Sequence, residues 1–258
     1  MDSLEKIKQD FNRMDKTISN RKIILIKAGA TFENIAKRYG DFEEWIINGL
    51  GCSKANARVI DSRTCLSLPD IRECESVVIS GSRSHVTENL DWVNSLAAWV
   101  PLIMDAGIPM LGICFGHQLL AHALGGMVGF NDKGREIGTV DINVDNSGKN
   151  DILFESLPLS FPANVSHKQS VLSLPKEAVR LAYNGHDANH AFRIGKCTWG
   201  LQFHPEFDSE VMRASILEQS EDLKKEGFDV EALSHSVKQT PEAFGILEKF
   251  AGIRVKNS

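Results

Sequence analysis

A cysteine set between two glycines is the feature of the sequence best suited to chemistry. Cys114 lies in the segment GICFG, between Gly112 and Gly116, after the apolar run 109–113. A nucleophile at a strand-to-helix turn needs small neighbours, because such a turn brings backbone segments close together. The amino end of the next helix favours a thiolate and offers N–H groups to an oxyanion. The pattern predicts a nucleophilic Cys114; a buried free cysteine at a glycine turn is the alternative.

A cysteine nucleophile requires a base and a group that orients the base. Among the eight histidines, His204 stands out because it follows the apolar run 199–203 and precedes Pro205 and Glu206. Pro205 favours an extended His204, and residues two apart in an extended segment share a side. Glu206 is therefore placed to hold the tautomer of His204.

The other histidines in these regions are weaker candidates. His117 and His122 are five positions apart in the helical segment after Cys114, so they do not share a face. His186 and His190 are four apart in a segment that has the pattern of a turn and a strand. Because no further ligand types cluster near them in the sequence, we predict no metal site, and no motif calls for a cofactor.

The elements that must position these groups alternate between strand and helix. Apolar runs closed by glycine or proline predict strands, and segments of helical periodicity predict helices. The predicted strands are 22–26, 76–82 and 109–113, and the predicted helices are 41–50, 89–105 and 118–124. The alternation predicts an α/β fold with a three-layer, mostly parallel open sheet. From about Arg135, shorter alternating runs such as GTVDINV predict antiparallel strands added to the same core.

The bulk composition is that of a globular protein. We predict one domain over 21–258, preceded by an amphipathic helical extension over 1–20. A net charge of −5 argues against nucleic acid as the main partner. Five cysteines without a CxxC pair favour a reducing, cytoplasmic location. The start lacks the apolar core of a signal peptide, and no run approaches the roughly 18 apolar residues of a membrane span.

Three separated blocks resemble the class I, triad-type glutamine amidotransferases. The similarity is greatest to stand-alone members that are like the glutaminase domain of GMP synthase. The blocks are VVISGSRSHV at 77–86, PMLGICFGHQLLAHALGG at 109–126 and GLQFHPEF at 200–207. The resemblance implies the flavodoxin-like form of the three-layer fold.

The resemblance also implies a role for each matching residue. Cys114 would attack the side-chain amide of glutamine, His204 would protonate the departing ammonia, and Glu206 would orient His204. The oxyanion hole would consist of the backbone N–H groups of Ser82 and Phe115. Three further residues would contact the substrate: Gly81, Gln118 and His167. A structural histidine near a loop is the alternative for His167.

Two departures from the family pattern concern the substrate pocket. Gly81-Ser82-Arg83 stands where the family often has Gly-Gly-Pro, and Lys168-Gln169 stands where it often has Gly-Asp. Arg83 and Lys168 could each reach a substrate carboxylate. No ATP-binding P-loop or pyrophosphatase motif is present, so ammonia would pass to a separate synthetase subunit or be released. A γ-glutamyl peptidase with the same triad, and a regulatory homologue without activity, are the alternatives.

Overall fold

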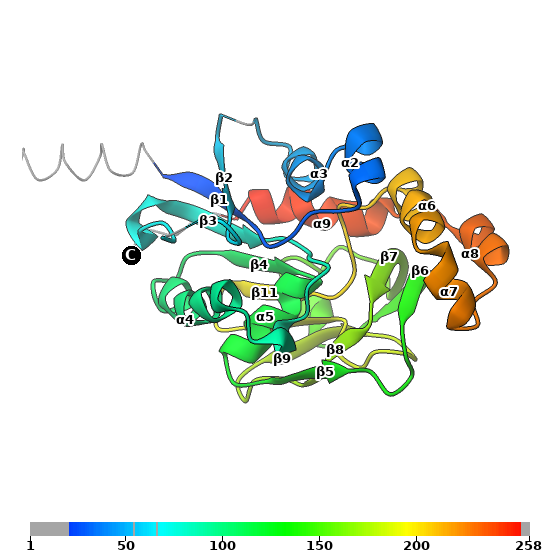
Figure 1. The fold of residues 1–258 in the computed structure, drawn as a ribbon. Coiled ribbons are helices and arrows are strands. Elements are labelled where there is room, and N and C mark those ends of the chain that lie inside the picture. The colour runs from blue at the N-terminus through cyan, green and yellow to red at the C-terminus, as the bar shows by residue number, and fades with distance from the viewer. Residues whose placement is uncertain (1–20, 54, 66, 254–258) are drawn as a thin grey trace, which may run out of the picture.

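The computed structural model describes residues 21–53, 55–65 and 67–253 (Figure 1). The helix predicted over 1–20 lies outside these residues. The strands are β1 (Lys22–Lys27), β2 (Ala57–Asp61), β3 (Cys74–Ile79), β4 (Met110–Ile113), β5 (Met127–Phe130), β6 (Glu136–Val144), β7 (Ser160–His167), β8 (Gln169–Ser173), β9 (Val179–Tyr183), β10 (Ala191–Ile194) and β11 (Thr198–Leu201). The helices are α2 (Glu33–Tyr39), α3 (Phe42–Gly49), α4 (Asp91–Asp105), α5 (Phe115–Ala123), α6 (Ser209–Glu218), α7 (Ser220–Lys225), α8 (Val230–Ser236) and α9 (Pro241–Ala251).

One large sheet organises the described residues. Its strand order is β2-β1-β3-β4-β11-β10-β9-β6-β7, and β5 and β8 form a separate antiparallel pair. The strands from β2 to β11 pair in parallel, and those from β11 to β7 pair antiparallel. Strands β4 and β11 lie side by side at the centre, with Gly112 opposite Gly200. The residues that follow these two strands therefore meet at one edge of the sheet.

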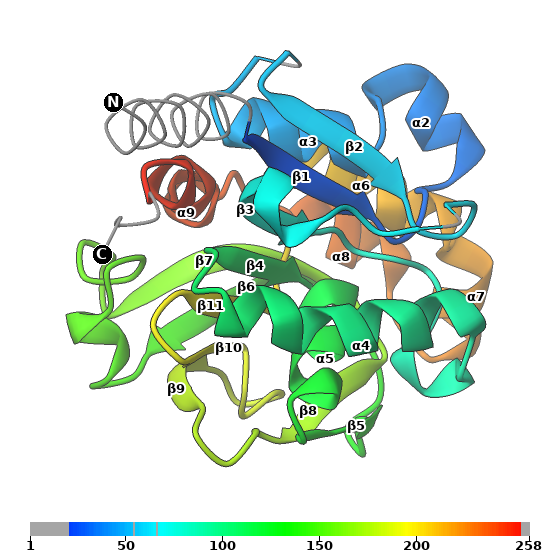
Figure 2. The same ribbon diagram turned by 90° about the vertical axis from the view of Figure 1, so that its left-hand side faces the viewer.

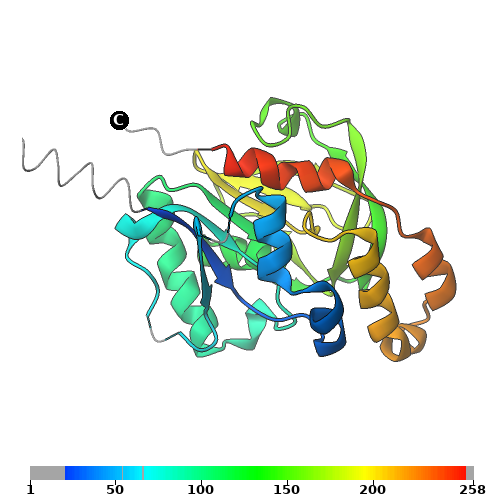
Figure 3. The same cartoon turned by 90° about the horizontal axis from the view of Figure 1, so that it is seen from above.

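Helices cover both faces of the sheet and make the three layers (Figure 2). Strand β1 is buried on both sides: Ile23 and Leu25 belong to one apolar core, and Ile24 and Ile26 to the other. Helices α3 and α9 pack on the first face, where they lie side by side in Figure 3. Helices α4 and α5 cover the second face. A strand buried on both faces is typical of the parallel sheets of α/β proteins.

The expected three-layer α/β fold with added antiparallel strands is confirmed. Strand 109–113 and helix 89–105 are found within one or two residues of their predicted bounds. The helix predicted from Gln118 begins earlier, at Phe115, and includes Gly116 in its first turn. None of the helices in the described part of the chain has both the length and the apolar character that a bilayer crossing requires.

Candidate active site

Cys114 occupies the turn between β4 and α5. Its backbone has φ 49° and ψ −97°, in the positive-φ region that residues with a side chain rarely adopt. Such a conformation costs on the order of 1–3 kcal/mol and persists only where neighbouring contacts impose it. The Cys114 N–H donates to the carbonyl of Leu201 at 2.7 Å, and its own carbonyl accepts from the N–H of Gln118 at 3.1 Å. Strand pairing and the following helix thus hold the turn from both sides.

The two glycines around Cys114 are required by close backbone contacts. A Cβ on Gly112 would lie 2.4 Å from the carbonyl oxygen of Gly116. A Cβ on Gly116 would lie 2.4 Å from the carbonyl oxygen of Ile79 in β3. Backbone atoms of a packed sheet and helix cannot move aside, so neither position accepts a side chain. Close packing of the backbone therefore requires glycine at both positions.

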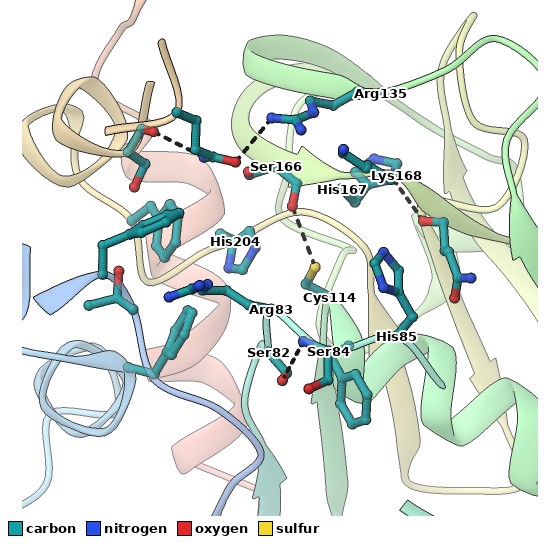
Figure 4. A pocket seen from close by; sticks show the side chains of 18 of the residues that line it. Ser82, Arg83, Ser84, His85, Cys114, Arg135, Ser166, His167, Lys168 and His204 are labelled. Carbon is teal, nitrogen blue, oxygen red and sulfur yellow. Dashed lines mark hydrogen bonds between the residues drawn. The ribbon is translucent and has the colours of Figure 1, made fainter. Parts of the chain in front are cut away.

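His204 and Glu206 lie together just after β11. The Nδ1 atom of His204 is 2.7 Å from Oε1 of Glu206, and both side chains are buried. The His204 ring stacks on Phe207 with 4.1 Å between centroids, and its backbone N–H donates to the carbonyl of Asn164 at 2.8 Å. Figure 4 shows the ring beside Cys114. The structure brings together the cysteine, histidine and glutamate that the sequence analysis singled out.

The protonation of His204 is controlled by its neighbours. Burial lowers the pKa of His204. The charges of Glu206 and Cys114 and hydrogen bonds to both raise it by more than burial lowers it, so the pKa rises from 6.5 to about 10. The imidazole is therefore protonated at neutral pH beside the thiol. This arrangement can hold a thiolate–imidazolium pair, the form in which a cysteine attacks a carbonyl carbon.

The loop after β3 brings a second backbone segment to the thiol. Ser82 lines the same cavity as Cys114 and Phe115. A Cβ on Gly81 would lie 2.9 Å from Cε1 of His204, so glycine leaves room for the imidazole ring. Phe115 begins α5, where the first N–H groups have no partner within the helix. The two residues expected to supply oxyanion donors thus border one cavity.

Gln118 is buried close to the thiol and takes part in a chain of amide hydrogen bonds. Its Nε2 donates to the carbonyl of Gln169 at 2.7 Å and to Oε1 of Gln202 at 3.0 Å. Gln202 in turn directs its Nε2 to Sγ of Cys114 at 3.5 Å. The sequence analysis did not single out Gln202. Its position two residues before His204, on the same side of an extended segment, was the available signal.

His167 borders the cavity, but both of its ring nitrogens have partners. Nδ1 lies 3.0 Å from the carbonyl of Gln169, and Nε2 lies 3.0 Å from Oε2 of Glu136. A carbonyl oxygen only accepts, so Nδ1 carries a hydrogen. Nε2 of His190 lies 3.0 Å from the same Glu136 oxygen, away from the direction of a good hydrogen bond. Burial raises the pKa of Glu136, but the two histidines lower it well below its usual range.

Glu136, His167 and His190 also form the group of described residues whose side chains could converge on a metal ion. Their ligand atoms lie within 4.8 Å of one another. The expectation that no ligand types gather near His190 is therefore wrong, because its neighbours come from distant parts of the sequence. Both contacts to Glu136 are 3.0 Å long, but only that of His167 has the geometry of a hydrogen bond. As it stands, the cluster is a buried carboxylate held between two imidazoles.

The two histidines of α5 lie apart from this chemistry. His117 is fully buried, and burial lowers its pKa to about 3, so its ring is neutral. That ring packs against Phe192 with 4.9 Å between centroids. His122 is exposed to solvent. Neither histidine lines the cavity beside Cys114, in agreement with the sequence analysis.

The thiol opens onto a cavity of about 330 Å³ (Figure 4). This volume is at the lower end of the range for small-molecule sites, about 300–1,000 Å³. Arg83 lies on the side of the cavity formed by the loop after β3, with its guanidinium 4.3 Å from the centre of the Phe32 ring. Arg135 and Lys168 lie on the other side of Cys114. The cavity therefore presents cationic groups on both sides of the thiol.

A model of a known protein family matches most of the chain. Residues 35–222 match the family model described as glutamine amidotransferase class-I. The chain belongs to this family.

Similar proteins include gamma-glutamyl peptidases and glutamine-hydrolysing GMP synthases. Gamma-glutamyl peptidase 4 of Arabidopsis thaliana is 29% identical over 197 residues, which cover 74% of this chain and 78% of the relative. Gamma-glutamyl peptidase 5 of the same plant is 30% identical over 198 residues, which cover 74% and 76%. The glutamine-hydrolysing GMP synthase of Vibrio cholerae is 29% identical over 197 residues, which cover 75% of this chain but 34% of the synthase.

Solved structures of the class I amidotransferase fold superpose on most of the chain. A glutamine amidotransferase from Thermotoga maritima has a TM-score of 0.72 at 24% identity and covers 89% of this chain and 96% of its own. A glutamine amidotransferase from Methylobacillus flagellatus has a TM-score of 0.65 at 20% identity, with 90% and 91% covered. At these identities the likeness concerns the fold.

Proposed function

We propose that this class I amidotransferase hydrolyses a γ-glutamyl amide bond through a thioester on Cys114, with glutamine as the smallest substrate. The observation that carries the proposal is the position of Cys114 at a strained strand-to-helix turn beside His204, whose Nδ1 is 2.7 Å from Glu206. A nucleophile, its base and the group that orients the base meet the geometric requirements of covalent acyl transfer.

The reaction proceeds in two halves. The thiolate of Cys114 attacks the γ-carbonyl carbon, and the C–N bond breaks as imidazolium His204 gives its proton to the leaving nitrogen. Neutral His204 then takes a proton from water, which attacks the thioester, releases glutamate and regenerates the thiolate. Glu206 keeps Nδ1 of His204 hydrogen-bonded throughout, so that the other ring nitrogen exchanges the proton.

The remaining predicted residues shape this site. The backbone N–H groups of Ser82 and Phe115 hold the oxyanion that forms on the γ-carbonyl oxygen. Gly81 leaves the space that the His204 ring fills. Gln118 and His167 contact the same acceptor, the carbonyl of Gln169, and so fix the wall of the cavity against which the substrate lies.

A γ-glutamyl peptidase activity is the second candidate. The cavity at Cys114 shares Arg135 and Lys168 with a neighbouring hollow, so a leaving group larger than ammonia has room beyond the scissile bond. Curated relatives named gamma-glutamyl peptidases align over about three quarters of this chain. Both candidates use the same thioester chemistry and differ only in the leaving amine.

The setting of the reaction is also part of the proposal. If ammonia is the useful product, a separate synthetase subunit receives it, since the chain aligns with about one third of the length of a GMP synthase. All five cysteines are free thiols, which favours a reducing compartment, the cytoplasm.

The test measures glutamate release from glutamine and from a γ-glutamyl dipeptide, by wild type and by Cys114→Ala. A diazoketone analogue of glutamine, followed by peptide mass analysis, reports acylation-competent Cys114 without requiring a partner subunit. We expect turnover and labelling of wild type, and neither with Cys114→Ala. Folded wild type that hydrolyses neither substrate and resists labelling at Cys114 would overturn the proposal.

A further inference from the structure

A second hollow adjoins the cavity at Cys114. It has a volume of about 400 Å³ and lies between the end of β5, the start of β6 and the loop after α7. The two spaces share Arg135 and Lys168 in their walls. Lys168 is two residues from Ser166, whose carbonyl oxygen is 3.9 Å from Sγ of Cys114. The hollow therefore begins next to the candidate nucleophile.

The charged residues that line this hollow leave a surplus of positive charge. They are three cations, Lys133, Arg135 and Lys168, and one acid, Glu226. The carboxylate of Glu226 serves two of the cations, at 2.9 Å from Nε of Arg135 and 3.0 Å from Nζ of Lys168. The ammonium of Lys133 donates to the neutral carbonyl of Gly185. One carboxylate among three cations leaves the hollow attractive to a second carboxylate.

The three cations differ in how freely they can meet a ligand. The Arg135 side chain is buried, 6% exposed, and both carboxylate oxygens of Glu226 contact its guanidinium. The Lys168 side chain is 43% exposed and is anchored at one point only. Lys133 is exposed as well. Arg135 thus belongs to the fixed wall, whereas Lys168 and Lys133 can turn their ammonium groups toward an incoming anion.

Aromatic side chains form the apolar part of the hollow. Phe130 and Phe228 line it, and Phe130 is 60% exposed. The Phe130 ring lies 5.3 Å, centroid to centroid, from His85, which lines the cavity at Cys114. An exposed aromatic ring at the junction of two cavities offers contact area to the uncharged part of a ligand that extends from one to the other.

We propose that this hollow binds the leaving amine, and that the preferred leaving amine carries a carboxylate, as the amino acid or peptide part of a γ-glutamyl peptide does. The inference rests on the proposed thioester chemistry at Cys114. The γ-glutamyl group occupies the cavity beside the thiol. The amine extends past Ser166, its carboxylate meets Lys168 and Lys133, and its apolar part meets Phe130.

The test compares two substrates that differ only in the charge of the leaving amine, γ-glutamylglycine and γ-glutamylglycinamide. The measured quantity is the ratio of their kcat/KM values in wild type, Lys168→Gln and Lys133→Gln. A charge-assisted contact contributes about a tenfold preference at a partly exposed site, so Lys168→Gln lowers the ratio about tenfold. Lys133→Gln lowers the ratio by a smaller factor. Lys224→Gln, which removes the same charge from the outer side of α7, keeps the wild-type ratio.

The outcomes separate this inference from the proposed function. Wild type that hydrolyses both substrates at equal kcat/KM, or a Lys168→Gln variant that keeps the wild-type ratio, would overturn the subsite and leave the thioester mechanism standing. A wild type that hydrolyses neither peptide and is not labelled at Cys114 would overturn the mechanism itself. A general structural effect of Lys168→Gln would lower both values together and leave the ratio where it was.

Discussion

His204 and His167 each lie buried beside a glutamate, and they differ in which ring nitrogens remain free. His204 has Nδ1 on Glu206 at 2.7 Å, which leaves its other nitrogen for Cys114. His167 has Nδ1 on the carbonyl of Gln169 and Nε2 on Glu136, so neither nitrogen is left. A base must exchange a proton during each turnover. In the proposed mechanism, only His204 keeps a ring nitrogen free for proton exchange, whereas His167 serves the structure.

The two pairs also differ in how they are built. His204 and Glu206 are two residues apart, so local extended backbone places them together. Glu136 and His167 are 31 residues apart and meet only because β6 and β7 pair, with Glu136 opposite His167 in the register. Breaking the His204–Glu206 pair should therefore lower mainly turnover, and breaking the His167–Glu136 pair should lower mainly the free energy of unfolding.

The largest effect is expected from Glu206→Gln. An amide cannot stabilise imidazolium His204 as a carboxylate does, so kcat falls by about 10²–10⁴. The folded pKa of His204, about 10, lies above its ordinary 6.5, so the ion pair stabilises the fold fully below pH 6.5 and this contribution is lost as the pH rises toward 10. Because Glu206 helps to raise this pKa, the variant lowers it. The alkaline limb of the kcat profile should therefore move to lower pH. A profile unchanged in both height and position would remove Glu206 from the mechanism.

Gly81→Ala should have the next largest effect. The new Cβ would lie 2.9 Å from Cε1 of His204 and 3.2 Å from Cε1 of Phe42, so the imidazole must shift. Displacement of a catalytic group by about 1 Å lowers turnover by about 10²-fold. The matched control is Gly185→Ala, where the added methyl meets nothing within 4 Å. Equal turnover of the two variants would show that the ring is not confined by Gly81.

Glu136→Gln should separate stability from turnover. Removing the carboxylate takes away the partner of buried His167 Nε2 and the 3.0 Å contact of His190, which lowers the free energy of unfolding by about 1–3 kcal/mol. Turnover per folded molecule should change less than about tenfold, because the cluster does not touch the reacting atoms. Denaturant titration measures the free energy of unfolding. The steady-state rate divided by the labelled fraction of Cys114 measures turnover per folded molecule, and exposed Glu155→Gln is the control. A loss of turnover as large as that of Glu206→Gln would make the second pair catalytic.

The smallest effect is expected from Ser82→Ala. In the proposed mechanism the backbone N–H of Ser82 holds the oxyanion, while its hydroxyl accepts a hydrogen bond from the N–H of Ser84 at 3.1 Å. Turnover should therefore change less than about fivefold, whereas removal of a true oxyanion donor lowers kcat by about 10²–10³. Steady-state kinetics with glutamine decides the matter, and a loss in the second range would assign the donor role to the hydroxyl.

The sequence predicted what is encoded locally. The glycines around Cys114, the His204-Pro205-Glu206 segment and the apolar run 109–113 are each read within a few residues, and each has its expected geometry. The sequence analysis missed β2 and α2, which have weak periodic signals in mixed segments. It also missed the cluster around Glu136, because strand register in the antiparallel half of the sheet brings those residues together. No local spacing encodes such a register.

The central position of β4 has a consequence for folding while the chain is still being synthesised. Strand β4 pairs with β3 on one side, but its other neighbour, β11, comes much later, and Cys114 and Gln202 are 88 residues apart. A growing chain folds as it is synthesised from its amino end. Until β11 emerges, the N–H of Cys114 lacks its acceptor on Leu201, and the thiol lacks His204. In the proposed mechanism, Cys114 therefore acquires its base only after β11 has joined the sheet, and a chain that ends before β11 cannot perform the reaction.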